Sequence, residues 1–124
     1  MTTQLASSPH AYRQSAVLAA TPGRLVVMLY DGARRFLHQA AVAMDEGQVP
    51  QSHYKLRRAE NIIIHLRDTL DMDQGEVAER LASIYRFCQG HLLQARAERS
   101  PQKIEQVSAL LGDLREAWAT IEQG

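Results

Sequence analysis

Apolar residues recur at helical spacing along four long stretches of this chain, and short breaks containing Gly, Pro or Asp separate the stretches. Apolar positions three or four residues apart share one face of a helix, so each stretch predicts an amphipathic helix. The helices are expected at about residues 22–46, 51–71, 75–98 and from 101 almost to the end. No segment shows strand alternation over a useful length. The pattern therefore predicts an all-α fold, an antiparallel four-helix bundle.

Start and stop signals support these boundaries. Thr21 and Ser100 each precede a proline, and a hydroxyl cap followed by proline is typical of a helix start. Gly47 and Pro50 are expected to end the first helix and turn the chain. The stripes expected to face the core are Leu25, Leu29, Ala33, Phe36, Ala40 and Met44; Leu56, Ala59, Ile63, Leu66 and Leu70; Val77, Leu81, Ile84, Cys88, Leu92 and Ala95; and Ile104, Val107, Leu111, Leu114, Trp118 and Ile121.

The start of the chain is patterned too weakly to predict a long helix. Residues 1–20 are interpreted as an N-terminal arm or short helix, and residues 21–124 as the bundle domain. The arm carries a few apolar side chains, among them Tyr12, Val17 and Leu18, which suit it to cover an apolar groove on the bundle.

Charge balance excludes several classes of protein. Fourteen Lys and Arg residues match fourteen Asp and Glu residues in 124, so the formal net charge is zero. A dedicated nucleic-acid binder or a membrane-surface anchor is usually basic. The sequence has no signal-peptide pattern and no apolar run long enough to insert into a membrane, so a cytoplasmic location is expected. Cys88 is the single cysteine and is expected to be a small buried hydrophobe.

The histidines give little support for metal or enzyme chemistry. The bundle sites of di-iron proteins need Glu-x-x-His, which occurs nowhere here, so neither a metal nor any other cofactor is expected. A bundle can also transfer phosphate through an exposed histidine, and His38, His65 and His91 lie on predicted helices. None of the three has a lysine within one turn. A histidine phosphotransfer signalling bundle remains the alternative function.

Two runs contain more apolar residues than one helix face can bury. Residues 25–30 read Leu-Val-Val-Met-Leu-Tyr, and Ile62, Ile63 and Ile64 are consecutive. One interpretation is a short bundle with a wide core. The other is a hydrophobic groove that receives an amphipathic helix of a partner. Leu29 and Ile63 are expected to be mainly structural.

Five motifs in order resemble one known family, the flagellar secretion chaperones called FliS. They lie between about residues 11 and 121: Ala11-Tyr12-x-Gln14; Thr21-Pro22-x-x-Leu25-x-x-Met28-Leu29-Tyr30-Asp31-Gly32-Ala33; Ala59-x-Asn61-Ile62-Ile63-x-x-Leu66 with Leu70-Asp71 and Gly75-Glu76-Val77-Ala78; Leu81-x-x-Ile84-Tyr85-x-Phe87 with Leu92-Leu93-x-Ala95; and Ile104-x-x-Val107-x-x-Leu110-Leu111 with Leu114-x-x-Ala117-Trp118.

The resemblance implies a non-enzymatic chaperone that binds the C-terminal segment of flagellin in the cytoplasm, prevents premature polymerisation and delivers it to the flagellar export gate. It also implies that the N-terminal arm covers part of the binding surface, with Tyr12 in the position of the family's gating aromatic. The residues expected to contact flagellin are Tyr12, Val17, Leu25, Met28, Ile62 and Ile64.

The chain's neutrality also predicts how the partner is recognised. Apolar contact should supply most of the affinity, so binding is expected to depend only weakly on salt. An exposed apolar groove on a neutral chain also raises the prospect of a homodimer.

Overall fold

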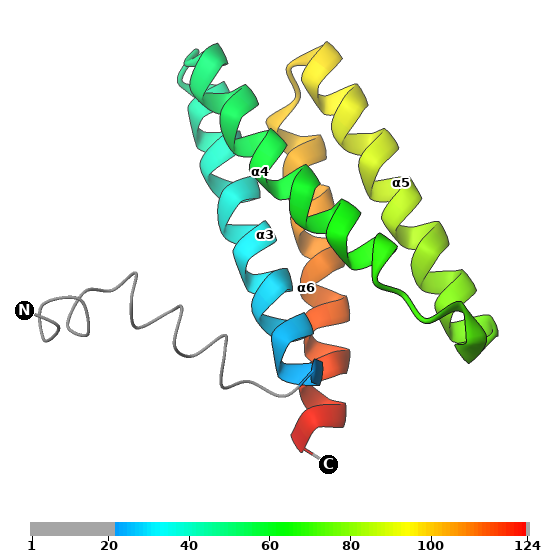
Figure 1. The fold of residues 1–124 in the computed structure, drawn as a ribbon. Coiled ribbons are helices and arrows are strands. Elements are labelled where there is room, and N and C mark those ends of the chain that lie inside the picture. Colours follow the sequence, from blue (N-terminus) through cyan, green and yellow to red (C-terminus); the bar gives the residue numbers. More distant parts are fainter. Residues whose placement is uncertain (1–21, 124) are drawn as a thin grey trace, which may run out of the picture.

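Four long α-helices and one short 3-10 helix make up the described part of the chain, residues 22–123 of the computed structural model (Figure 1). In chain order they are α3 (Pro22–Asp45), α4 (Val49–Asp68), η1 (Met72–Gln74), α5 (Glu76–Glu98) and α6 (Pro101–Gln123). Successive long helices run in opposite directions, so the all-α antiparallel four-helix bundle is confirmed. The proposed arm of residues 1–20 lies outside the described residues, as does Thr21.

Local signals place most helix ends. The hydroxyl of Ser100 accepts a hydrogen bond from the backbone N–H of Lys103 at 3.3 Å, which is the predicted cap of α6. Gly47 turns the chain after α3 with a φ of 75°, a left-handed conformation that glycine adopts without strain. Pro50 was predicted to belong to the break, but it lies in the first turn of α4. Proline is tolerated there because the first N–H groups of a helix have no partner within it.

The second helix also ends earlier than expected. Thr69 follows α4, and both its hydroxyl and its backbone N–H donate to the carbonyl of His65, at 2.8 and 3.0 Å. Asp71 then accepts a hydrogen bond from the N–H of Asp73 and begins η1. These side-chain bonds compete with continued helix, which moves the end of α4 from residue 71 to Asp68.

The core follows the predicted stripes in α4, in the second half of α5 and in the first half of α6, and departs from them mainly at the start of α3, at the start of α5 and at the end of α6. The fully buried apolar side chains include Leu37, Leu56, Ile63, Cys88, Leu92, Ile104, Val107 and Leu111. In α5 the buried positions near the start are Ala78, Ala82 and Tyr85, each one residue later than predicted. Val77 and Ile121, expected in the core, are 64% and 69% exposed.

The departures at the start of α5 have a geometric cause. Figure 1 shows α4 and α5 leaning away from α3 and α6 toward the η1 end of the bundle. The contacts of α5 with α4 and α6 are correspondingly fewer than those of α3 with the same two helices. The bundle is therefore closed at the end where α5 meets α6 and open at the η1 end, where apolar side chains are left partly uncovered.

Candidate binding groove

An apolar groove runs along the face shared by α3 and α4. It consists of two adjoining hollows of about 690 and 410 Å³, and Leu29 and His65 line both. The first hollow lies at the start of α3 and is lined by Pro22, Leu25, Val26, Met28, Leu29, Asp31, Arg35, His65 and Thr69. The second continues toward the middle of both helices and is lined by Leu29, Phe36, Arg58, Asn61, Ile62 and His65.

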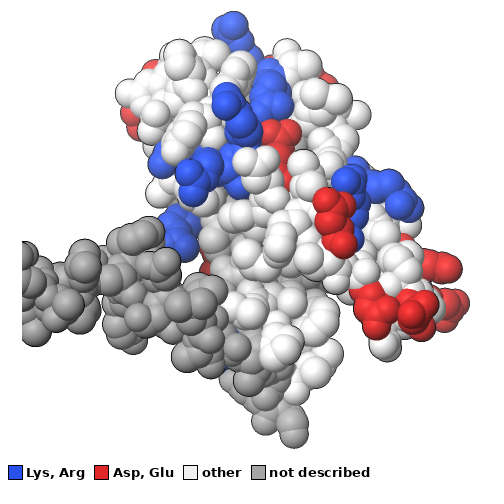
Figure 2. Space-filling model, viewed as in Figure 1, with Lys and Arg blue, Asp and Glu red and all other residues white. Residues whose placement is uncertain are grey.

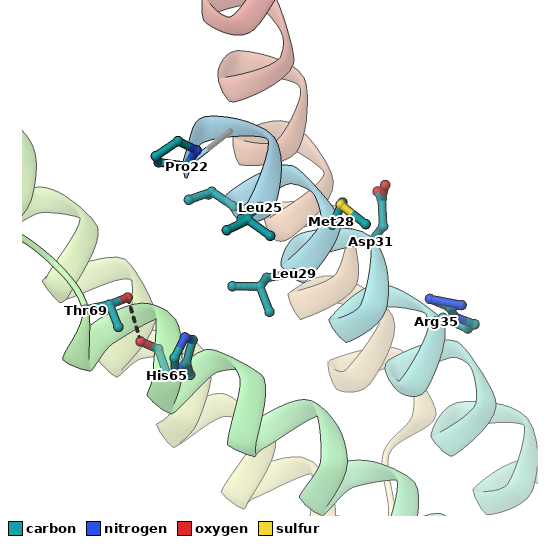
Figure 3. A pocket seen from close by; sticks show the side chains of 9 residues that line it. Pro22, Leu25, Met28, Leu29, Asp31, Arg35, His65 and Thr69 are labelled. Atoms are coloured by element: carbon teal, nitrogen blue, oxygen red, sulfur yellow. Dashed lines mark hydrogen bonds between the residues drawn. The ribbon is translucent and has the colours of Figure 1, made fainter. Parts of the chain in front are cut away.

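Helical spacing explains why these side chains meet. Leu25, Leu29 and Phe36 lie on one stripe of α3, and the intervening turn carries Gly32. A Cβ atom at Gly32 would lie 3.6 Å from Cδ1 of Ile62, so this glycine borders the isoleucine at the floor of the groove. On α4 the facing stripe continues at three- and four-residue intervals through His65 to Thr69. These side chains lie in the seam between two antiparallel helices, whereas Met28, Asp31 and Arg35 extend the first hollow around α3 on the side away from α4 (Figure 3).

Three of the six predicted contact residues line the two hollows. Leu25 and Met28 line the first hollow and Ile62 lines the second. Figure 3 shows Leu25 projecting toward α4, whereas Met28 lies on the side of α3 that faces away from α4. Ile64 is half-buried on α4 but lines neither hollow. Tyr12 and Val17 lie outside the described residues.

One residue expected in the core also lines the groove, and two lining residues were missed. Leu29 was expected to be mainly structural; it is half-buried and packs against the core, and it also forms the point where the two hollows join. Ile63 is fully buried, so its structural role is confirmed. Phe36 and His65 line the groove although the sequence did not single them out for it. Their spacing could have identified both. Phe36 follows Gly32 by four residues on α3, and His65 follows Ile62 by three residues on α4, so each lies on the same stripe as a groove residue.

A smaller cleft of about 250 Å³ opens at the η1 end, between α4, α5 and α6. Val26 and Thr69 line both this cleft and the first hollow, so the apolar surface continues around the open end of the bundle. Its walls include Leu70, Val77, Leu81, Tyr85 and Trp118. Several residues expected in the core thus line this cleft instead, because α5 leans away from α3.

Two buried tyrosines lie behind the cleft. The hydroxyl oxygens of Tyr30 on α3 and Tyr85 on α5 are 2.5 Å apart, and both side chains are almost completely buried. Burial raises the pKa of Tyr85, and hydrogen bonding to Tyr30 adds to that rise. Burial also raises the pKa of Tyr30, although hydrogen bonding with Tyr85 and Trp118 opposes the change. Both hydroxyls therefore stay protonated at neutral pH and link α3 to α5.

This pair should behave as a coupled unit. Tyr85→Phe removes one hydrogen-bond partner of the buried Tyr30 hydroxyl and is expected to lower the free energy of unfolding by about 1–3 kcal/mol. The double variant Tyr30→Phe/Tyr85→Phe should lose less than the sum of the two single losses, because each single variant already breaks the hydrogen bond that the two hydroxyls share. Urea unfolding of the four proteins measures the coupling, and strictly additive losses would contradict it.

Two histidines and the cysteine make structural contacts. His91 Nε2 lies 2.6 Å from Oε1 of Gln106, and its ring stacks on Phe87. His38 pairs with Glu105 at 3.4 Å. Cys88 is fully buried as predicted, and burial raises the pKa of its thiol to about 11. Among the described residues, no cluster of three or more His, Cys, Asp or Glu side chains is arranged to hold a metal. Within the same residues, every helix is too short or too polar to span a membrane.

Comparison with known proteins identifies the family of this chain. The model of the family FliS, described as flagellar protein FliS, matches residues 5–124. The chain belongs to this family. The resemblance seen in the sequence motifs is thereby confirmed over nearly the whole chain.

Named relatives agree with the family model. The chain is 38% identical over 122 residues to the flagellar secretion chaperone FliS of Salmonella typhimurium, covering 94% of this chain and 90% of the relative. It is 35% identical to the protein of the same name from Vibrio cholerae, over 86% of this chain and 79% of the relative. The corresponding Bacillus subtilis protein is 32% identical, over 87% and 80%. FliS relatives are named as chaperones, a non-enzymatic role, so the chain is placed in a chaperone family and not among enzymes.

Proposed function

We propose that this protein is a cytoplasmic export chaperone that binds the C-terminal segment of flagellin, prevents its premature polymerisation and delivers it to the flagellar export apparatus. The observation that carries the proposal is the continuous apolar groove on α3 and α4 in a member of the FliS family. The name of the relatives, flagellar secretion chaperone, supports a client that is secreted through the flagellum.

The groove offers what a holding chaperone needs physically. A polymerising client exposes an amphipathic helix, and covering its apolar face blocks self-association. Burial of apolar surface contributes about 25 cal/mol per Å². Ordering a disordered client subtracts several kcal/mol, so the bound segment must cover a long surface. The two hollows and the adjoining cleft together provide such a surface along α3 and around the η1 end of the bundle. No bond is made or broken in this process, so no catalytic group is needed.

Calorimetric titration with a peptide from the C-terminus of the cognate flagellin tests the proposal. Binding at micromolar concentration is expected, together with slower polymerisation of the full flagellin when the chaperone is present. Absence of binding at these concentrations would overturn the proposal. Measuring molar mass by light scattering, with and without the peptide, would show whether the free protein forms a homodimer and whether the client disperses it.

Tyr12 and Val17 are proposed to belong to an arm that covers the groove before the client binds. The first hollow lies at the start of α3, immediately next to where residues 1–21 join the bundle, which suits this role. A covered groove lowers the apparent affinity by the fraction of molecules that are open.

Tyr12→Ala is therefore expected to tighten binding of the flagellin peptide by about tenfold, the equivalent of losing one buried apolar anchor. Tyr12→Phe is the matched control and should bind as the original protein does, since it keeps the ring. Calorimetry on the three proteins measures the effect. Identical isotherms for the alanine and phenylalanine variants would remove the gating role.

A further inference from the structure

We propose that the groove sets the direction of its client: an amphipathic helix lies along it with an acidic C-terminal end at Phe36 and Arg58, and a basic N-terminal end at Thr69 and Asp71. The inference rests on the proposed function and deepens it, because it states the charge pattern and polarity of the segment that is bound. It is carried by the distribution of charge along the groove.

One end of the groove carries cations stacked on aromatic rings. The Nζ atom of Lys55 lies 5.6 and 5.7 Å from the ring centroids of Phe36 and Tyr54. The guanidinium of Arg58 lies 5.1 and 6.0 Å from the same two rings and donates a hydrogen bond to the Tyr54 hydroxyl at 3.2 Å. The rings hold the two cations beside the second hollow, which Phe36 and Arg58 both line.

These cations have no carboxylate partner in the described part of the chain. Ion pairs elsewhere neutralise other arginines: Arg96 pairs with Glu60 at 2.7 Å and Arg115 with Asp31 at 3.0 Å. In contrast, no described acidic group lies within 4 Å of Lys55 or Arg58. A cation held in place without a counter-charge is available to a carboxylate of a ligand.

Beyond the opposite end of the groove, the adjoining cleft and the segment after it carry the opposite charge. Asp71 lines the cleft that adjoins the first hollow, and Asp73, Glu76 and Glu79 follow it around η1 and the start of α5, all exposed. Figure 2 shows Lys and Arg gathered over the upper part of this face, Asp and Glu gathered by the α4–α5 connection, and an uncharged expanse between them. The zero net charge of the chain therefore conceals a separation of charge along one face.

This separation favours one orientation of a bound helix. A helix carries partial positive charge at its N-terminus and partial negative charge at its C-terminus. Basic side chains in the first turns and acidic side chains in the last turns add to the charge that the helix presents to the groove, although they lower the stability of the isolated helix. When the acidic C-terminal end of the client lies at Arg58 and Lys55, it neutralises these two cations. In the reverse orientation, the basic end of the client meets the cations and its acidic end meets the acidic residues. The client helix then runs parallel to α3 and antiparallel to α4.

A pair of designed peptides isolates this effect. From Pro22 to Phe36 the groove is about 21 Å long at the rise of an α-helix, so a helix of about 18 residues covers it. Both peptides carry the same apolar face and zero net charge. One has Lys in its first turns and Glu in its last turns, and the other has the two exchanged at positions matched for exposure. The peptide with Lys in its first turns is the less stable helix, because its end charges oppose the helix dipole, so both are stapled to equal helicity.

The peptide with the acidic C-terminal end is expected to bind about tenfold tighter at low salt, and the difference should fall to about twofold in 1 M NaCl, where charges are screened beyond about 3 Å. Arg58→Glu should abolish the preference between the two peptides. Arg86→Glu, a charge reversal at an exposed arginine on α5 outside the groove, should leave it unchanged. Equal affinity of the two peptides, or equal effects of the two variants, would overturn the inference.

The orientation itself can be read from Trp118, the single tryptophan of the chain, which lines the cleft at the acidic end. A dansyl group on the N-terminus of the preferred peptide should receive energy from Trp118 efficiently, and the same group on its C-terminus should receive much less. Equal or reversed transfer would contradict the stated direction.

The flagellin peptide separates this inference from the proposed function. If it binds the original protein and loses no more affinity in Arg58→Glu than in Arg86→Glu, the chaperone function stands and the directional reading fails. If it does not bind at all while the designed peptides retain their preference, the groove is directional and flagellin is the wrong client.

Discussion

Leu25→Glu is expected to weaken binding of the flagellin C-terminal peptide at least a hundredfold while leaving the bundle folded. Leu25 is half-buried, lines the first hollow and projects across it toward α4 (Figure 3). In the free protein a glutamate there can turn to solvent, so the fold loses little. When the client docks, the carboxylate must be desolvated against apolar surface at a cost of several kcal/mol. Each 1.4 kcal/mol lowers the affinity tenfold.

The matched control for this prediction is Leu93→Glu. Leu93 lies on α5, is 63% exposed and lines none of the hollows on the α3–α4 face. The same change of charge and shape at this position should leave the affinity for the peptide, measured by calorimetry, within about twofold of that of the original protein. Equal losses at the two positions would show that the client covers α5 as well. A loss at Leu93 alone would place the binding surface away from α3 and α4.

Ile63→Ala is expected to lower the free energy of unfolding by about 2–5 kcal/mol, a large share of the roughly 5–15 kcal/mol that stabilises a domain of this size. Ile63 is fully buried where α4 meets the core. Truncation removes its buried methyl groups and leaves a cavity that tightly packed neighbours cannot fill. Urea unfolding followed by circular dichroism measures the loss from the shift in the midpoint.

Its neighbours in the sequence provide the contrast. Ile62 and Ile64 are half-buried on the two flanks of the same helix, so alanine at either is expected to cost less than about 1.5 kcal/mol. Ile62→Ala should in addition weaken the flagellin peptide, because Ile62 lines the second hollow. Three equal losses of stability would contradict the division of this triplet into core and groove positions.

The fold could be predicted from the sequence because its signals are local. The 3.6-residue periodicity, the Ser100-Pro101 start and the glycine at residue 47 each act within one or two turns of helix. Errors at the ends of α4 arose where two local signals compete. Proline occurs both after helices and in their first turn, and Pro50 lies in the first turn of α4. At Thr69 the hydroxyl donates a hydrogen bond to the carbonyl of His65, and the helix ends although the apolar stripe continues.

The candidate site was predictable only in part, for a different reason. The surplus of apolar residues at 25–30 and 62–64 showed that some must lie outside the core, but surplus alone does not say which. Leu29 and Ile63 both fit a core stripe, yet one joins two surface hollows and the other is fully buried. The choice depends on the rotation of each helix about its axis, which is a property of the assembled bundle.

By itself, the sequence determined the number and approximate extent of the helices, the family and the surplus of apolar side chains. The tertiary structure decided where that surplus lies. Because α5 leans away from α3, Val77 and Leu81 border an open cleft instead of a closed core. Because α3 and α4 are antiparallel, Phe36 comes to lie beneath Lys55 and Arg58 at the opposite end of the groove from Asp71. The burial of a side chain and the separation of charge on a surface both depend on residues that are distant in the sequence. Only the packing of the helices brings those residues together.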